Sequence, residues 1–333
     1  MPDLVSILIP TYNAEAWIAS TLECAASQTW PNTEIIVVDD GSTDRSREIA
    51  EQFAERFGGR SAGEVAGTDV RVIAQENRGA CAARNRALGE AQGEYIQFLD
   101  ADDLMEPDKI EVQMRRLADA PPRTVAATRW ARFYEEVGDG PHPPVPDTWE
   151  HPDPVEWLAE AHAGRAIMTP HGWLTPRKVA EDAGPWDEDI LVNQDGEYFA
   201  RVLLDASRIA FCADTATYYR SGIEGSVSRR SSAPALRSKI EFASRITDAL
   251  LERRSSRRVR QASADAFQRI LYQAYPAFPE IARRAEEHVR ELGGSSLTPG
   301  GSRFFHWLCQ IVGWKTALRL RYHYRQLRYP KRS

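Results

Sequence analysis

The amino-terminal part of the chain alternates between two hydrophobic periodicities, and this alternation limits the fold more than any other feature. Short runs rich in β-branched residues are separated by stretches with the spacing of amphipathic helices. Such a βαβαβαβ order predicts an α/β fold, with a mainly parallel sheet and helices on both of its faces. The strand runs lie at 5–9, 34–38, 70–73 and 95–99, and the helical stretches lie near 14–28, 43–57, 79–91 and 107–119.

A polar segment follows each of the four strand runs. Ligands of such sheets gather where the parallel strands end. The first segment lacks the GxGxxG motif of dinucleotide-binding dehydrogenases, so a nicotinamide cofactor is not expected. Tyr12 offers a flat ring on which a base can stack, and Asp39 offers an acceptor for a base N–H. The four segments are PTYN at 10–13, DDGSTD at 39–44, QENRG at 75–79 and DADD at 100–103.

Three carboxylates crowd at the end of the fourth run, in the stretch QFLDADD at 97–103. On their own, Asp100, Asp102 and Asp103 suit a solvated turn or a helix cap. They also suit a site for Mg²⁺ or Mn²⁺, because hard divalent cations select carboxylate oxygen and cancel the repulsion among the acids. Their position beside the other strand ends favours the metal site.

Taken together, the four segments resemble the family 2 glycosyltransferases, which have the GT-A fold. The matching stretches are VSILIPTYN at 5–13, EIIVVDDGSTDRS at 34–46, NRGACAARNRAL at 77–88 and YIQFLDADD at 95–103. The resemblance covers about residues 3–230 and implies inverting transfer from a nucleotide-sugar donor, with UDP-sugars as the first candidates. It also implies that Asp102 binds Mn²⁺ or Mg²⁺. The nucleotide-sugar site that it implies consists of Pro10, Thr11, Tyr12, Asp39, Asn77, Gly79, Arg84, Asp100, Ala101 and Asp102.

Sugar transfer requires a base that takes the proton of the attacking hydroxyl. In the family, an acidic pair before an aromatic-containing helix supplies it. Here Gln194 takes the first position of the pair, so Asp195 is the predicted catalytic residue and Glu197 is the competing candidate. The alternative reading of these two acids is an N-cap and a first-turn acid that only stabilise the helix.

The acceptor side is expected between these two regions. The stretches at 169–177 and 184–189 resemble the acceptor region of the family, with His171, Trp173 and Trp186 as candidate contacts beside Glu197. Both tryptophans offer a ring on which a sugar can stack, although each also suits a buried core.

One position departs from the family pattern. Many relatives carry a histidine shortly after a Tyr-Arg pair, where it approaches the metal or the diphosphate. This chain has Gly222, Ile223 and Glu224 there, which leaves Arg220 and Ser226 as candidate diphosphate ligands. The missing histidine, together with Gln194, leaves a non-catalytic sugar-nucleotide-binding protein open as an alternative. A nucleotidyltransferase also stays open, because such enzymes place carboxylates at a nucleotide-binding sheet.

The carboxyl-terminal part differs from the rest in pattern and charge. We expect a catalytic domain at 1–230 and a helical region at 231–333, with further helices near 257–274, 278–292 and 303–328. Residues 303–333 contain eight Lys and Arg and no acid, so removing them from the net charge of −6 leaves −14 for the remainder. This tail is expected either to pack as an ordinary helix or to contact an anionic membrane surface.

The remaining expectations concern partners and location. A net charge of −6 carries no nucleic-acid signature, so no nucleic-acid partner is expected. The expected partners are a nucleotide-sugar donor and a glycan or lipid-linked acceptor. Four scattered cysteines and the lack of a basic, apolar leader before Val5 indicate a cytoplasmic protein, with the inner face of the membrane as the alternative location.

Overall fold

The computed structural model describes residues 2–57, 69–141, 153–166, 169–190, 192–222 and 232–328. The chain divides into two compact units. The first consists of Met1–Trp157, Ile167–Ile190 and Gln194–Gly225, and the second consists of Leu158–Ala166, Leu191–Asn193 and Ser226–Ser333. The candidate diphosphate ligand Ser226 lies outside the described residues, as do Ile223 and Glu224, which stand near the position of the family histidine.

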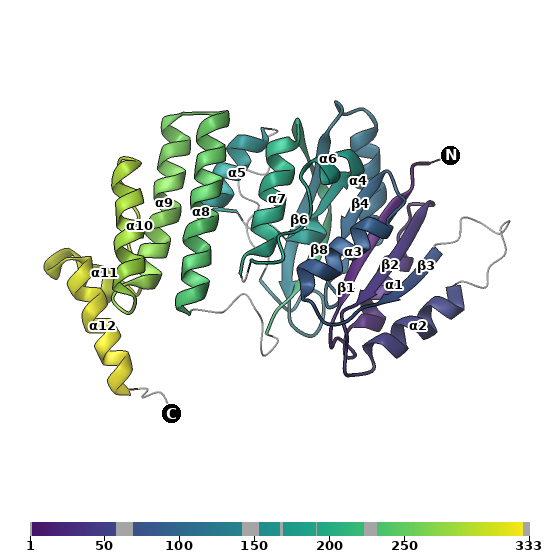
Figure 1. The fold of residues 1–333 in the computed structure, drawn as a ribbon, viewed down its shortest axis with the longest axis horizontal. Helices are drawn as coiled ribbons and strands as arrows, with labels where there is room; N and C mark the ends of the chain where they lie inside the picture. Colours follow the sequence, from purple (N-terminus) through teal and green to yellow (C-terminus); the bar gives the residue numbers. More distant parts are fainter. Residues whose placement is uncertain are drawn as a thin grey trace. The chain divides into compact units, whose positions relative to one another are not determined.

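The first unit is built around a sheet whose described strands follow the order β3-β2-β1-β4-β7-β6-β8-β5 (Figure 1). The strands β3, β2, β1 and β4 are parallel neighbours, β7 is antiparallel to β4 and β6, and β6 is parallel to β8. The predicted α/β fold with a mainly parallel sheet is confirmed. The strands are β1 (Val5–Thr11), β2 (Thr33–Asp39), β3 (Asp69–Ala74), β4 (Tyr95–Phe98), β5 (Leu104–Met105), β6 (Thr124–Phe133), β7 (Trp173–Pro176) and β8 (Arg208–Arg220).

Helices cover both faces of the sheet at its centre. Every residue of β1 and β2 is therefore buried. Ile7 and Ile35, which share one face, pack in one hydrophobic cluster with Leu22 and Ile110 from two of the helices. The helices that precede residue 206 are α1 (Ile18–Ala26), α2 (Ser46–Phe57), α3 (Ala80–Glu90), α4 (Lys109–Ala118), α5 (Pro154–His162), the short 3-10 helix η2 (Pro170–Gly172), α6 (Arg177–Asp182) and α7 (Gln194–Asp205).

The second unit is helical, as predicted. The side chains of Ser232, Ser256 and Ser302 accept a backbone N–H at the start of α8, α9 and α11, which satisfies one free donor of each helix. The expected helix at 303–328 is instead two helices, separated at Gly313, whose φ of 77° ends the first one. The helices are α8 (Ala233–Arg253), α9 (Arg257–Ala274), α10 (Pro279–Glu291), α11 (Arg303–Val312) and α12 (Trp314–Arg328). Among the described helices, none combines the length and the hydropathy needed to cross a bilayer.

A buried carboxylate, Glu34, joins three neighbours of β2. One of its oxygens accepts from the Ser6 hydroxyl at 2.6 Å and from the Gln92 and Gly93 N–H groups at 2.6 and 3.1 Å, and the other accepts from Arg71 at 2.6 Å. Burial alone would raise the pKa of Glu34, but the hydrogen bonds from Ser6, Gln92 and Arg71 outweigh it and lower that pKa. The ionised form is therefore favoured by folding.

Replacing this carboxylate should destabilise the first unit. We expect Glu34→Ala to lower the free energy of unfolding at pH 7 by about 3 kcal/mol, because Arg71 and two backbone donors lose their acceptor. A lowered pKa stabilises the fold above the unfolded pKa and is lost as the pH falls through the folded pKa, so the difference should shrink in acid. Urea denaturation at pH 7 and pH 4 measures this. The control Glu51→Ala removes an exposed α2 pair with Arg47 and should cost less than about 0.5 kcal/mol; an equal cost for both variants would contradict the prediction.

Candidate active site

The ends of β1 and β2 bring the first two predicted nucleotide contacts together. Thr11 and Asp39 are paired in the sheet register, and each is only 2% exposed. The Thr11 hydroxyl and the Asp39 Oδ1 atom are buried without a hydrogen-bond partner among the described residues. Tyr12, next to them, is 51% exposed. Buried polar atoms normally have partners, so this pair suits a ligand that both donates and accepts hydrogen bonds.

Asp40 positions the loop that precedes α3, a role that the sequence did not reveal. Its carboxylate accepts from the backbone N–H of Arg78 at 2.9 Å, from that of Gly79 at 2.7 Å and from the Gln75 side chain at 2.8 Å. The loop also approaches Gly41, where a Cβ atom would lie 2.9 Å from the Asn77 nitrogen. The predicted contacts Asn77 and Gly79 therefore lie beside the end of β2.

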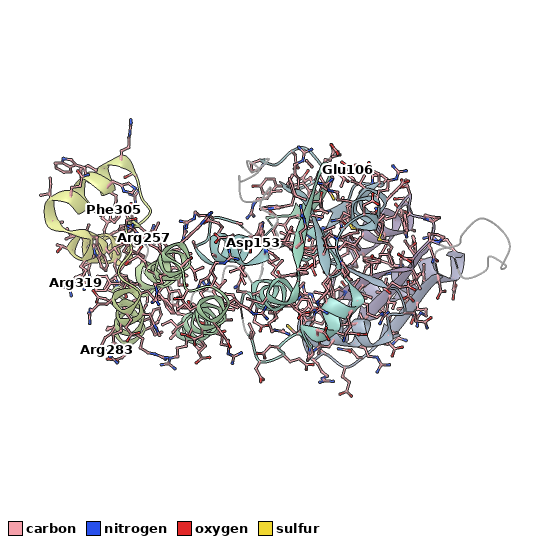
Figure 2. The ribbon with its side chains drawn as sticks, turned by 90° about the horizontal axis from the view of Figure 1, so that it is seen from above. Glu106, Asp153, Arg257, Arg283, Phe305 and Arg319 are labelled. Atoms are coloured by element: carbon pink, nitrogen blue, oxygen red, sulfur yellow. The ribbon has the colours of Figure 1, made fainter. Side chains whose placement is uncertain are left out.

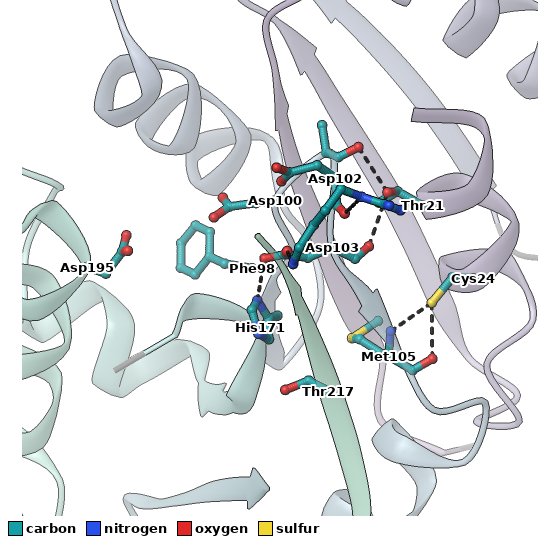
Figure 3. Close-up of polar contacts among 12 residues, drawn as sticks. Thr21, Cys24, Phe98, Asp100, Asp102, Asp103, Met105, His171, Asp195 and Thr217 are labelled. Carbon is teal, nitrogen blue, oxygen red and sulfur yellow. Dashed lines mark hydrogen bonds and ion pairs between the residues drawn. The ribbon is translucent and has the colours of Figure 1, made fainter. Parts of the chain in front are cut away.

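Three acids follow β4, and their loop is held by residues of three other elements (Figure 3). The Thr21 hydroxyl donates to the carbonyl groups of Ala101 and Asp103 at 3.0 and 3.1 Å. Asp103 is fully buried; its Oδ1 accepts from the Arg220 N–H at 2.8 Å, and its Oδ2 lies 2.8 Å from Nδ1 of His171. Arg220 also donates to the Asp102 carbonyl at 2.9 Å. Asp103 thus stabilises the conformation of this loop through its contacts with Arg220 and His171.

Asp102 differs from Asp103 because no histidine lies against its carboxylate in the described chain. Burial, followed by the charges of Asp103 and Asp100, raises the pKa of Asp102 to about 8. The described residues contain no group of three acidic, histidine or cysteine side chains placed to hold a metal ion. A cation at Asp102 would therefore take most of its ligands from a bound molecule and from water, which is the usual arrangement for Mg²⁺.

Arg84 connects the acids after β4 with the acid at the start of α7. Its guanidinium is buried, donates to Asp100 at 2.7 Å, and lies 3.6 Å from Asp195 and 4.5 Å from the centre of the Trp186 ring. Burial opposes the charge of Arg84, but the two acids outweigh it and raise its pKa. For Asp195, burial and the charge of Asp100 outweigh the attraction of Arg84 and raise its pKa to about 6. Figure 3 shows Asp195 on one side of Phe98 and the acids that follow β4 on the other.

Glu197, the competing candidate, has a partner of its own. It is 7% exposed and pairs with Arg201 at 2.7 Å, and Arg201 also donates to the Pro185 carbonyl at 2.8 Å. This contact joins α7 to the segment before it. Asp195 keeps a side chain that is 36% exposed, so it alone of the two is accessible to a ligand.

The predicted acceptor contacts are buried. His171 is 0% exposed and Trp173 and Trp186 are each 1% exposed. Trp186 stacks on Tyr198 at 4.1 Å, and Trp173 meets Trp157 edge-on at 5.0 Å. Neither indole therefore presents a free face to a sugar, which corrects the expectation of two stacking surfaces. The physical reason is that so large an apolar surface is more stable inside the aromatic cluster.

Two tyrosines near the ends of β6 and β8, Tyr134 and Tyr219, were not predicted from the sequence as residues of the site. Tyr219 stacks on His171 at 6.2 Å, and the charges of the nearby acids add to burial in raising its pKa. Tyr134 is 47% exposed, its carbonyl accepts from Arg220 at 3.2 Å, and it lies next to Gly222. No periodic pattern marked β6 in the sequence, so nothing placed Tyr134 near the acids.

Comparisons with known proteins identify the family and the fold of the chain. The model of the family described as Glycosyl transferase family 2 matches residues 6–184. The chain is 33% identical to EpsH of Bacillus subtilis (strain 168) over 161 residues, which are 48% of this chain and 43% of EpsH. It is 31% identical over 227 residues to EpsJ of the same organism, named an uncharacterized glycosyltransferase, covering 66% of this chain and 62% of EpsJ. The chain thus spans about half the length of these curated relatives.

Solved structures share the fold at low sequence identity. Residues 1–349 of S. aureus TarS superpose with a TM-score of 0.63 and 19% identity, covering 98% of this chain and 93% of that chain. The same fragment in complex with UDP-GlcNAc gives a TM-score of 0.59 at 17% identity, covering 86% and 90%. The mannosyltransferase PcManGT from Pyrobaculum calidifontis, in complex with GDP-Man and Mn²⁺, gives 0.51 at 18% identity, covering 99% and 88%. These likenesses show the fold.

Arg84 should be required for the stability of the site at neutral pH. We expect Arg84→Met to lower the free energy of unfolding by about 3 kcal/mol at pH 7, because Asp100 and Asp195 then face each other without their cation. At pH 5 the difference should be smaller, since Asp195, whose pKa is raised to about 6, then becomes protonated. Chemical denaturation at both pH values measures it.

Arg86→Met is the matched control, because Arg86 lies on the same helix in an exposed pair with Glu90 at 2.8 Å. It should cost less than about 0.5 kcal/mol. A difference for Arg84→Met that stayed constant between pH 7 and pH 5 would show that lost packing, and not charge, explains its effect.

Proposed function

Because the chain belongs to glycosyl transferase family 2, we propose that it moves a sugar from a nucleotide-sugar donor to an acceptor hydroxyl, with inversion at the anomeric carbon. The observation that carries the proposal is the placement of Asp195 opposite the acids that follow β4, with Arg84 between them. The acids that follow β4 could hold a cation that receives the leaving diphosphate, while Asp195 receives a proton. TarS in complex with UDP-GlcNAc supports a UDP-sugar as the first donor to test.

The donor would bind along the ends of β1, β2 and β4. We propose that Thr11, Tyr12 and Asp39 bind the nucleotide base. The unpaired polar atoms of Thr11 and Asp39 suit hydrogen bonding, and the exposed ring of Tyr12 suits stacking. Asp100 would lie near the ribose, held in place by Arg84. The loop at Asn77 and Gly79, with the backbone of Pro10 and Ala101, would close the rest of the nucleotide site.

Asp102 would hold a divalent cation, Mn²⁺ or Mg²⁺. Burial and the neighbouring acids raise its pKa, so a bound cation would stabilise the ionised form, and carboxylate oxygen is the preferred ligand of these ions. When bound, the ion would neutralise the charge that develops on the diphosphate as the sugar leaves. The complex of PcManGT with Mn²⁺ supports this choice.

Asp195 would act as the general base. The acceptor oxygen forms a bond to the anomeric carbon while the bond from that carbon to the diphosphate breaks, and Asp195 takes the proton of the hydroxyl. A base with a pKa of about 6 is ionised at neutral pH and accepts a proton better than an ordinary aspartate. The proposed acceptor is a glycan or lipid-linked chain, and the proposed location is the cytoplasm.

The donor is tested by screening nucleotide sugars for Mn²⁺-dependent release of the nucleoside diphosphate. A transferase should leak slowly to water without acceptor. Release of pyrophosphate would indicate a nucleotidyltransferase instead. Binding of a donor with no turnover under any condition would indicate a non-catalytic sugar-nucleotide-binding protein.

Asp102→Asn should remove metal-dependent activity. We expect donor turnover to fall by about three orders of magnitude, because an amide does not supply the charge that a divalent ion needs. The rise in melting temperature that Mn²⁺ gives to the wild-type protein should also disappear, which tests metal binding apart from catalysis. Asp119→Asn, an exposed change at the end of α4, is the control. Full wild-type activity in EDTA would refute the metal site.

Asp195→Asn should slow transfer by roughly two to four orders of magnitude and leave donor affinity unchanged, as expected when only the general base is lost. In the wild-type protein, turnover should rise as the pH rises through about 6, because the deprotonated carboxylate is the active form. The variant should lose this dependence. Glu197→Gln should lower stability through Arg201 and keep the pH profile; if it slowed turnover more than Asp195→Asn, the base would be Glu197.

A further inference from the structure

The last two helices carry most of the large apolar side chains that the described chain exposes. Ten such residues are exposed, and seven of them lie between 304 and 327. This is a concentration on two short helices and not the scatter that soluble surfaces normally show. The seven are Phe304, Trp307, Ile311, Val312, Leu320, Tyr324 and Leu327.

The other side of the same helices is packed, so the exposed side is fixed in orientation. Phe305 of α11 is buried in one cluster with Leu318 of α12. Trp314 meets Tyr272 and Tyr275 of α9 edge-on, with ring centres 5.1 and 5.5 Å away. Phe305 is labelled in Figure 2, together with Arg319 of α12. The two expectations for this tail therefore describe its two sides, one packed and one exposed.

Each helix presents its exposed apolar residues as a stripe. Phe304, Trp307 and Ile311 follow one another at spacings of three and four on α11, and Leu320, Tyr324 and Leu327 do so at four and three on α12. These spacings place each set along one side of its helix. All six are between 52% and 84% exposed, so no described part of the chain covers either stripe.

The charge around the stripes is positive. Arg303, Arg319 and Arg325 are exposed, and none forms an ion pair with an acid of the described chain. Lys315 is paired with Glu286 at 2.7 Å, and residues 303–333 contain no acid. A second copy of this face would bring like charges together, whereas an anionic surface would neutralise them.

We infer that α11 and α12 dock on an anionic lipid surface. The apolar stripes would enter the headgroup region, and the arginines would contact lipid phosphates, as in amphipathic helices that lie in a membrane interface. This goes beyond sugar transfer, because it concerns where the protein works and holds whatever donor it uses. It also suits a lipid-linked acceptor, which would diffuse in the same surface.

Co-sedimentation of the full chain with vesicles tests the inference. The protein should pellet with phosphatidylcholine vesicles that contain phosphatidylglycerol, pellet less in high salt, and stay in solution with phosphatidylcholine alone. Charge reversal of the three exposed arginines should lower the partition coefficient at least about 100-fold, which corresponds to about 1 kcal/mol for each cation. The same charge change on α9 and α10 is the control and should have a much smaller effect. The test variant is Arg303→Glu, Arg319→Glu, Arg325→Glu, and the control is Arg260→Glu, Arg284→Glu, Arg290→Glu.

The apolar stripe of α11 is tested separately. Phe304→Ser, Trp307→Ser, Ile311→Ser should abolish the part of the binding that resists high salt, whereas Tyr134→Ser, Val137→Ser should not, although these two residues are similarly exposed. Unchanged melting temperatures would show that all variants fold. Equal, weak pelleting of every protein would overturn the inference. So would a dimer of the wild-type chain that the α11 variant dissociates without any lipid binding, because the stripe would then bind a second copy.

Discussion

The site depends on the repulsion among carboxylates that the fold places close together. Asp100, Asp102 and Asp103 follow one strand, and Asp195 approaches them from α7. Two contacts make this arrangement stable without a ligand: Arg84 lies between Asp100 and Asp195, and His171 lies against Asp103. Asp102 has no such contact, and burial together with the charges of Asp103 and Asp100 raises its pKa to about 8, which favours the protonated form. A cation bound there would favour the ionised carboxylate again.

The availability of a compensating arginine also distinguishes the two acids at the start of α7. Glu197 and Asp195 lie two residues apart, yet Glu197 has an arginine of its own and Asp195 shares Arg84 with Asp100. A carboxylate with a dedicated partner holds structure, whereas one that shares its partner with another acid keeps a raised pKa and an accessible oxygen. The proposal of Asp195 as the general base rests on these partners, because spacing on the helix does not distinguish the two residues.

The sequence predicted those strands and helices whose hydrophobic pattern is visible within a short stretch of residues. The strands β1 and β2 are buried on both faces, so each contains a nearly continuous apolar run. The strand β6 was missed because its sequence, TVAATRWARF, mixes alanine with threonine and arginine, and its place in the sheet comes from pairing with β8 far along the chain. The same reason hid the bracing of the acidic loop by Arg220. Trp173 and Trp186 were visible as residues, but their burial depends on Tyr198 and Trp157, which only the tertiary structure brings near.

Gly313 decides which side chains of the tail are packed and which are exposed. Phe305 and Leu318 are thirteen positions apart, so in one straight helix they would point in directions that differ by roughly 140°. They nevertheless share one cluster, because the chain turns at Gly313 with a φ of 77° and begins a new helix with a new phase. A side chain at this position would strain that backbone conformation. The break thus allows both helices to pack one side on α9, and it leaves each with an apolar stripe that the described chain does not cover.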